Sequence, residues 1–181
     1  MQDTGIVRRI DELGRVVIPK EIRKTLRIRE GDPLEIYTDK DQLVLKKYSP
    51  INSVLDHVQT VARGISELLD KPCIITDNDQ VICLTGLKNK ETIGKTITSD
   101  METVLKERKS VVVNSSDGGK IVPVIKGEDG SVENQIIVPI ISGGDCYGSV
   151  TVFDTDKTAR FTPSDLKLVK LGAEFLSKQF E

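Results

Sequence analysis

The sequence has few of the residues from which metal sites, disulfide frameworks and many active sites are built. Its 181 residues include one histidine, three cysteines and no tryptophan. A structural zinc site usually takes about four Cys or His ligands, and three cysteines without metal-ligand spacing fit neither such a site nor a disulfide framework. We therefore expect no metal and no cofactor. We expect Cys73, Cys83 and Cys146 to be buried or half-buried thiols in strands, kept reduced.

Long apolar runs are absent as well. No segment approaches the roughly 18–20 apolar residues that a membrane span needs, and residues 1–9 contain no apolar signal-peptide core. We therefore expect a cytoplasmic protein with no membrane partner. The apolar fraction of 38% and the charged fraction of 30% are typical of a globular chain, and the length suffices for one ordinary domain or two small ones.

Candidate catalytic groups are equally sparse. His57, the only histidine, lies between apolar positions of an expected helix, where a solvated or helix-packed role is expected. Asp77 and Asp79 are close in sequence but typical of a turn. The segment 115–120 lacks the full spacing of a phosphate-binding loop. Because no nucleophile, base and orienting group stand together in the pattern, we expect that the chain is not an enzyme.

What the sequence does hold is a charge asymmetry between its two parts. Residues 1–50 carry 11 Lys and Arg against 9 Asp and Glu, whereas residues 51–181 carry 15 against 19. The net charge of −2 therefore conceals a slightly basic first part and an acidic remainder. Such polarity suggests two modules with different partners.

The first module is predicted to be small and rich in strands. Its expected elements are strands at 5–11 and 15–18, a helix that begins at Pro19, and strands at 33–38 and 42–48. Ile18, Ile22 and Leu26 are four residues apart and should form the apolar stripe of the helix. A module of this size buries too little surface to be stable alone. Without a metal or a disulfide, the remaining option is an obligate dimer whose chains share one core.

A cluster of basic side chains supplies the chemistry of this module. Its members are Arg8, Arg9, Arg15, Lys20, Arg23, Lys24 and Arg27. The spacing of the last four puts them on one helix face, while Ile22 and Leu26 point into the core. An arginine fork matches phosphate oxygens and a guanine edge in a bidentate way. Charge alone leaves two alternatives open: a DNA-binding surface, and a solvated helix face that pairs with Glu21.

A longer pattern decides between these alternatives. Residues 4–26, with the core Leu13-Gly14-Arg15-Val16-Val17-Ile18-Pro19, resemble the AbrB family of transition-state regulators, and residues 34–37 and 45–48 match as well. The resemblance covers residues 4–48, about a quarter of the chain. It implies a homodimeric swapped-hairpin barrel with one short helix that binds double-stranded DNA. Sporulation regulators within the family carry a second domain, so the resemblance also implies control of late sporulation genes, by activation or repression.

The same resemblance assigns the contacts with DNA. By position, the DNA-contacting residues of the family fall on Arg8, Arg15, Arg23 and Lys24, and Arg9 is a neighbour that contributes. The family commonly has arginine at the position of Lys24, and lysine keeps the charge but loses the fork. We therefore expect Lys24 to contact phosphate and not to read bases. Recognition in the family is held to depend on the shape and flexibility of DNA.

Residues 51–71 are predicted to form a heptad linker helix. Its apolar seam, spaced alternately four and three apart, consists of Ile51, Leu55, Val58, Ala62, Ile65 and Leu69. A coiled-coil connector and the first helix of the second domain are both open. Gly64 within the helix is expected to allow the close approach of another helix.

Residues 72–181 are predicted to form an α+β domain with an antiparallel sheet. Expected strands lie at 72–76, 80–84, 111–113, 135–141 and 147–153, expected helices at 98–109, with Ser99 as cap, and from Thr162 onward, and expected loops at 114–120 and 126–134. The hairpin formed by 137–141 and 148–153 resembles that of a GAF domain. The expected division is therefore 1–50 for DNA binding, 51–71 for the linker helix and 72–181 for a GAF-like sensor or oligomerisation domain.

Two alternatives stay open for the whole chain. A GAF-like domain implies either a pocket for an unknown small-molecule effector or a purely oligomerising role, and pairing of two dimers through the heptad helix or the C-terminal helix would give a homotetramer. A swapped-hairpin antitoxin, which binds DNA and a toxin, would also resemble residues 1–50. Such antitoxins usually end in a disordered acidic tail, whereas the periodic pattern of residues 51–181 predicts a folded domain.

Overall fold

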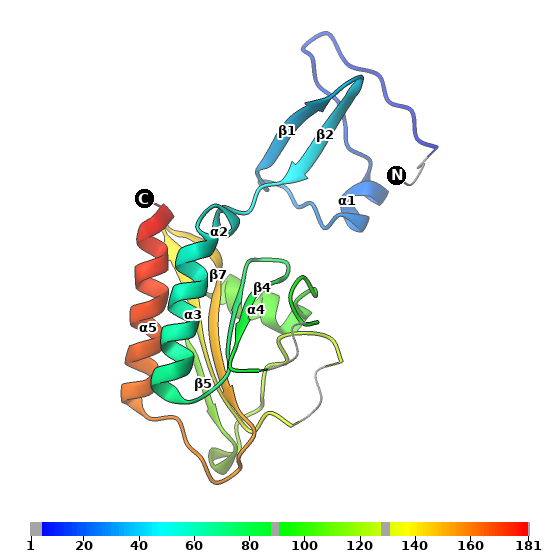
Figure 1. The fold of residues 1–181 in the computed structure, drawn as a ribbon. Helices are drawn as coiled ribbons and strands as arrows, with labels where there is room; N and C mark the ends of the chain where they lie inside the picture. Colours follow the sequence, from blue (N-terminus) through cyan, green and yellow to red (C-terminus); the bar gives the residue numbers. More distant parts are fainter. Residues whose placement is uncertain (1–4, 88–90, 128–130, 181) are drawn as a thin grey trace. The chain divides into compact units, whose positions relative to one another are not determined.

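A computed structural model of the chain describes residues 5–87, 91–127 and 131–180 (Figure 1). The chain divides into two compact units, Met1–Tyr48 and Ser49–Glu181. Thr4, the first residue of the AbrB-like stretch, and residues 128–130 of the expected loop at 126–134 lie outside the described residues. Within the described part, no helix is long and apolar enough to cross a membrane.

The first unit consists of a β-hairpin and one short helix. Strand β1 (Leu34–Asp39) pairs antiparallel with β2 (Gln42–Lys47), and the ladder runs from Leu34 opposite Lys47 to Asp39 opposite Gln42. Helix α1 (Lys20–Thr25) begins directly after Pro19, whose fixed φ suits the first turn. The strands predicted at 33–38 and 42–48 and the helix after Pro19 are confirmed.

Three predictions for the first unit are wrong. Residues 5–11 and 15–18 form no strands: the Asp11 N–H donates to the Arg15 carbonyl beside the turn, but no ladder of backbone hydrogen bonds continues along the described part of these segments, and a strand needs such a ladder. Arg27 has a φ of 52° and lies beyond the helix, so it does not share the face of Arg23 and Lys24. Leu26 is exposed instead of buried.

The exposure of Leu26 is part of a wider feature of this unit. Among its described residues only Pro19 is buried. The exposed apolar side chains include Val7, Ile10, Leu13, Val17, Ile36 and Leu43. Val7, for example, is 87% exposed. A single copy of this unit therefore closes no core, as its length alone predicts.

The second unit is an α+β domain built around a five-stranded antiparallel sheet with the strand order β4-β3-β7-β6-β5. The strands are β3 (Cys73–Thr76), β4 (Val81–Thr85), β5 (Val111–Asn114), β6 (Asn134–Ser142) and β7 (Asp145–Asp154). The helices are α2 (Pro50–Ser53), α3 (Leu55–Leu69), α4 (Ser99–Glu107) and α5 (Pro163–Ser177), with short 3-10 turns η1 (Ser115–Asp117) and η2 (Lys178–Phe180). All five strands predicted for this region are confirmed.

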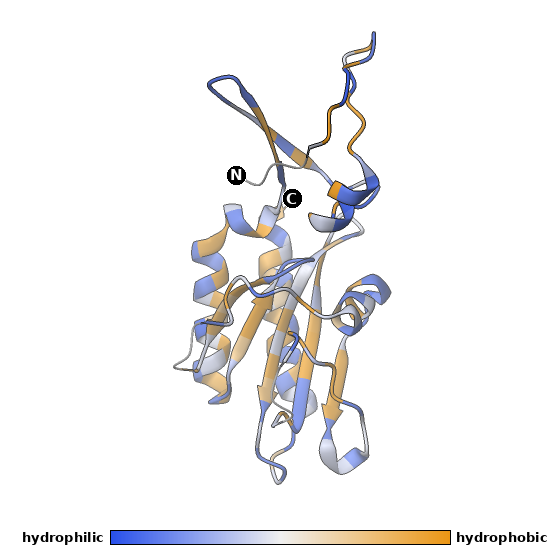
Figure 2. Ribbon diagram, turned by 90° about the vertical axis from the view of Figure 1, so that its right-hand side faces the viewer, coloured by the Kyte–Doolittle hydropathy of each residue, from blue (hydrophilic) through white to orange (hydrophobic). Residues whose placement is uncertain are grey.

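Both faces of this sheet are covered, and the side-chain period of two divides its residues between them. On β3, Cys73 and Ile75 pack toward the core formed with α3 and α5, whereas Ile74 packs on the opposite face. On β6, Ile136 faces the first core and Ile137 packs with residues of α4. In Figure 2 the strands of this unit are mostly hydrophobic (orange), whereas its helices carry both hydrophobic and hydrophilic (blue) residues.

The helix expected at 51–71 is interrupted. Val54, with φ −120° and ψ 31°, separates α2 from α3, so the heptad seam is not one continuous helix. Val58, Ala62 and Ile65 of that seam are buried in the core beneath α3 and α5. The two alternatives were a coiled-coil connector and the first helix of the second domain. The packing of α3 favours a helix of the second unit.

The other two long helices begin with side-chain caps. The hydroxyl of Thr98 accepts a hydrogen bond from the Met101 N–H at 3.1 Å, so the cap of α4 lies one residue before the predicted Ser99. Thr162 and Asp165 form a reciprocal capping box that starts α5 where the sequence predicts it.

The glycine that permits close helix approach is Gly172 and not Gly64. A Cβ on Gly172 of α5 would lie 2.6 Å from Ile65 Cδ1 and 3.0 Å from Val61 Cγ1, both on α3. A Cβ on Gly64 would meet nothing within 4 Å. The expectation for Gly64 was therefore wrong, because the two helices meet along another face of α3.

Gly64→Ala and Gly172→Ala should change stability in opposite directions. Both substitutions gain helix propensity, an effect of about 0.5–1 kcal/mol. Gly64→Ala finds open space, so we expect the free energy of unfolding to rise by that amount. Gly172→Ala must displace Ile65, and because overpacking costs about 1–3 kcal/mol we expect a net loss. Urea denaturation of the full chain, followed by circular dichroism, measures both; equal shifts would contradict the close α3–α5 contact.

Candidate nucleic-acid interface

A tight turn at residues 11–15 presents Arg15. One carboxylate oxygen of Asp11, Oδ1, accepts hydrogen bonds from the Leu13 N–H at 3.0 Å and the Arg15 N–H at 2.8 Å. The other, Oδ2, lies 2.7 Å from Arg15 Nε. The backbone N–H of Asp11 also donates to the Arg15 carbonyl, and Gly14 supplies a φ of 77°. The hydrogen bonds from the Arg15 backbone and side chain lower the pKa of Asp11, so this carboxyl group is ionised at neutral pH.

Arg8 and Arg9 lie on the segment that leads into this turn. Both side chains are exposed, and so are the adjacent apolar residues Val7 and Ile10. The segment therefore offers cationic and apolar side chains at neighbouring positions. In an extended segment successive side chains point to opposite sides, so Arg8 and Arg9 do not share one face.

Helix α1 carries the remaining predicted contacts. Arg23 and Lys24 are exposed and lie in its last turn, and Glu21 lies in its first. This arrangement suits the helix dipole, which favours acidic groups near the N-terminus and basic groups near the C-terminus. The structure brings Arg23 and Lys24 together on one short helix, whereas Arg15 lies on the separate turn at 11–15.

Not every basic residue of the first unit is available to a ligand. Lys47 Nζ lies 3.0 Å from Asp32 Oδ2 and donates to the Arg27 carbonyl at 3.0 Å. Asp32 Oδ2 also accepts the Arg29 N–H at 2.9 Å. These contacts fasten the loop after α1 to β2. The role of Lys47 is therefore to hold the fold, in contrast to the exposed set Arg8, Arg9, Arg15, Arg23 and Lys24.

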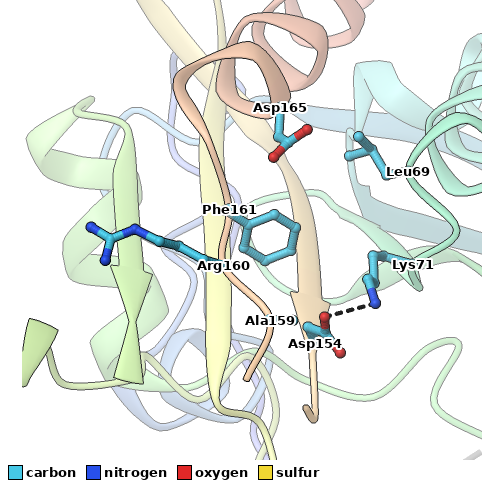
Figure 3. A pocket seen from close by; sticks show the side chains of 7 residues that line it. All are labelled: Leu69, Lys71, Asp154, Ala159, Arg160, Phe161 and Asp165. Carbon is cyan, nitrogen blue, oxygen red and sulfur yellow. Dashed lines mark ion pairs between the residues drawn. The ribbon is translucent and has the colours of Figure 1, made fainter. Parts of the chain in front are cut away.

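The second unit holds a small polar cavity of about 150 Å³. Its lining residues, drawn in Figure 3, are Leu69, Lys71, Asp154, Ala159, Arg160, Phe161 and Asp165. Lys71 Nζ lies 2.8 Å from Asp154 Oδ2, and this bond raises the pKa of Lys71. Arg160 points away from the Lys71–Asp154 pair and binds Asp117 at 2.9 Å. Asp165 caps α5, so the charged groups of this cavity are already engaged.

The face of the sheet beneath α4 is closely packed. Ile97, Met101, Val104, Leu105 and Ile137 are all buried there in one cluster, against which Val111, Val122 and Cys146 pack. Apolar side chains thus occupy the space between α4 and β6. Within the described residues, no three His, Cys, Asp or Glu side chains lie close enough to hold a metal ion.

The polar residues singled out in the second unit have structural roles. Asp77 Oδ1 accepts the N–H groups of Asp79 and Gln80, which confirms the predicted turn. Asp77 Oδ2 accepts the Ser49 hydroxyl at 2.9 Å, and burial raises the pKa of Asp77. His57 packs edge-on against Phe175, with ring centroids 6.0 Å apart. The predicted helix-packed role of His57 is confirmed.

Sequence relatives cover both units. The family model described as stage V sporulation protein T C-terminal, transcription factor, matches residues 55–181. The stage V sporulation protein T of Bacillus subtilis (strain 168) is 42% identical over 182 aligned residues, which cover 100% of this chain and 99% of that protein. The chain belongs to the stage V sporulation protein T family. This relationship spans the whole chain, whereas the AbrB resemblance is confined to its N-terminal part.

Within this stage V sporulation protein T family member, the first unit has relatives of its own. The transition state regulatory protein AbrB of Bacillus subtilis (strain 168) is 64% identical over 50 residues, 28% of this chain and 52% of that protein. The family model described as antidote-toxin recognition MazE, bacterial antitoxin, matches residues 7–53. The AbrB-like character of the N-terminal domain is thereby confirmed.

Solved structures identify the fold of the second unit. A fragment of a methyl-accepting chemotaxis protein, residues 122 to 287, superimposes with a TM-score of 0.60 at 15% identity, covering 72% of this chain and 92% of that one. The GAF domain of an Acinetobacter phosphoenolpyruvate-protein phosphotransferase gives 0.58 at 15% identity, covering 74% and 83%. The C-terminal part of this stage V sporulation protein T relative therefore has a GAF-like α+β fold.

The three cysteines should differ in their reactivity toward a thiol reagent. Cys73 and Cys83 are buried in strands and Cys146 is half-buried, which confirms their predicted environment. Burial raises the pKa of Cys73 and of Cys146, which keeps both as unreactive thiols near neutral pH. We expect a chromogenic disulfide reagent to label only Cys146 in the native chain, slowly, and all three in denaturant. Cys146→Ser should abolish the native signal; rapid native labelling of Cys73 would contradict its burial.

Proposed function

We propose that this chain is a regulator of late sporulation genes that binds double-stranded DNA through residues 1–50. The observation that carries the proposal is the exposed basic set Arg8, Arg9, Arg15, Arg23 and Lys24, on a module 64% identical to a transition state regulatory protein. A description as transcription factor also accompanies the matching family model. Lys24 supplies a point charge for phosphate, whereas the arginine forks suit both phosphate and base edges.

A homodimer formed through the first unit is the second part of the proposal. Val7, Leu13 and Val17 are exposed in a single copy, and residues 5–11 and 15–18 are not strands there. A second copy would supply both the missing ladder and the missing core, as in a swapped-hairpin barrel. Two-fold symmetry would also double the basic surface.

The remainder of the chain is proposed to join and assemble such dimers in the cytoplasm. Residues 51–71 would connect DNA binding at 1–50 with a GAF-like domain at 72–181. On α3 and α5, Leu68, Leu171 and Phe175 are exposed, and Leu171 is 66% exposed. Apolar side chains fill the space between α4 and the sheet, which leaves no room there for a small-molecule effector. We therefore favour oligomerisation to a tetramer over effector binding. We propose no catalytic role, since one relative is named as a transition state regulatory protein and the matching family model is described as a transcription factor.

A swapped-hairpin antitoxin is the alternative that the match to the MazE model over residues 7–53 supports. An antitoxin of this kind uses a disordered tail to bind its toxin. Here residues 49–181 form a compact unit with a fully covered sheet. We therefore favour the regulator.

Arg15→Ala and Arg23→Ala should each weaken binding to a DNA duplex that the wild-type chain selects from a random-sequence pool. Each lost bidentate contact is worth about 1–3 kcal/mol, and a dimer loses two. In native gels across a salt series, we expect the slope of log affinity against log salt to be shallower for each variant than for the wild type, by roughly 0.9 per phosphate contact removed. Lys106→Ala, on α4, is the matched control and should bind as the wild type does. Unchanged binding by a folded Arg15→Ala dimer would refute this interface.

Leu171→Glu should separate the tetramer into dimers. A charge at an apolar contact between dimers would be desolvated without a partner, which opposes association. We expect sedimentation equilibrium of the wild type at micromolar concentration to give a tetramer and that of the variant to give a dimer. Lys170→Glu, one residue earlier on α5, controls for the added charge. A wild-type chain that sediments as a dimer throughout would exclude this assembly.

A further inference from the structure

We propose that Asp11 is a positioning residue for DNA recognition, which holds Arg15 so that the outer edge of its guanidinium faces the DNA. This inference rests on the proposed DNA-binding function and deepens it. It concerns an acidic residue inside a basic cluster, whose charge would by itself oppose phosphate binding. The two oxygens of this carboxylate make different contacts.

The first carboxylate oxygen shapes the turn. Asp11 Oδ1 accepts the N–H groups of Leu13 and Arg15, and the Gly14 N–H donates to the Asp11 carbonyl at 3.0 Å. These contacts define a closed loop from residue 11 to residue 15. An amide oxygen could make the same contacts, because backbone N–H groups need only an acceptor.

The second carboxylate oxygen orients the side chain. Asp11 Oδ2 accepts the Nε–H of Arg15 at 2.7 Å, which engages the inner corner of the guanidinium. A guanidinium carries five N–H donors in a rigid plane, so fixing Nε also fixes the direction of the two terminal nitrogens. The Arg15 side chain remains 71% exposed. Its terminal nitrogens are therefore presented as a ready bidentate edge for guanine or for phosphate.

The Asp11–Arg15 pair lowers the local positive charge but fixes the orientation of the Arg15 guanidinium. An unconstrained arginine must lose rotamer freedom when it binds, whereas a positioned arginine has lost it already. The carboxylate meanwhile reduces the local positive charge, which weakens the contact with any phosphate. Asp11 should therefore favour a site that fits the preset guanidinium and disfavour random DNA. It acts on the ratio of the two affinities.

Asp11→Asn separates positioning from turn formation. The amide oxygen can replace Oδ1 as acceptor for Leu13 and Arg15, but the amide nitrogen cannot accept the Nε–H. We expect this variant to bind the selected duplex about fivefold more weakly, within the range of coupling for side chains in contact. We expect its affinity for a mixed-sequence duplex of equal length to be unchanged or higher. Thermal unfolding and dimer formation should match the wild type, whereas Asp11→Ala should lower the melting temperature.

A double-mutant cycle with Arg15→Ala tests this inference, because the positioning effect of Asp11 requires Arg15. In the Arg15→Ala background, we expect Asp11→Asn to cause no loss of affinity for the selected duplex, and the removal of its negative charge to raise both affinities alike. An equal loss in both backgrounds, or an equal loss on both duplexes, would overturn the inference and leave Asp11 as a turn former. If the wild type binds neither duplex, the proposed function itself fails. If the wild type binds and Arg15→Ala binds equally well, the Arg15–Asp11 assignment fails together with the proposed interface, whereas DNA binding by the chain stands.

Discussion

The first unit cannot bury its own apolar side chains, and the remaining features of the chain depend on this constraint. With only Pro19 buried among its described residues, the unit gains too little from the hydrophobic effect to offset the entropy of ordering its backbone. Its stability must come from association. In the proposed homodimer, the first unit would be folded only where its partner is present, so protomer concentration would set both folding and DNA binding.

The second unit obeys the opposite rule. Its sheet is covered on both faces, with Val58 and Ala62 of α3 fully buried on one side and Met101 of α4 on the other. This unit closes its core within one copy. The apolar residues left exposed on α3 and α5, such as Leu171, are thus free to serve assembly without being needed for folding. The chain thus combines a first unit that buries little apolar surface in one copy with a second unit that closes its own core.

Apolar runs and helix-start signals were sufficient to predict the five strands and the start of α5 in the second unit, but not the break between α2 and α3 at Val54. All five strands were found because each is a short apolar run between turn residues, and Thr162 marked the start of α5 through its capping box. The strands at 5–11 and 15–18 were not found in one copy, because β-propensity describes what a segment can pair with and not whether a partner is present. The sequence also could not predict which glycine lies at the contact between α3 and α5. Gly64 and Gly172 both lie within helices, and only the packing distinguishes them.

The candidate site was predictable in its charges but not in its geometry. A count of charges identifies Arg8, Arg15 and Arg23 as candidate contacts. The same count treats Asp11 only as a residue that lowers the net positive charge of the cluster. The four-residue spacing of Asp11 and Arg15 around a Leu-Gly turn was the available signal, since an acid and a base on either side of a tight turn are brought face to face. Once they meet, the sign of the acidic contribution depends on the DNA: repulsive toward any phosphate, and favourable toward a site that fits a fixed guanidinium. Specificity in such a cluster is therefore a property of pairs of residues, which net charge cannot reveal.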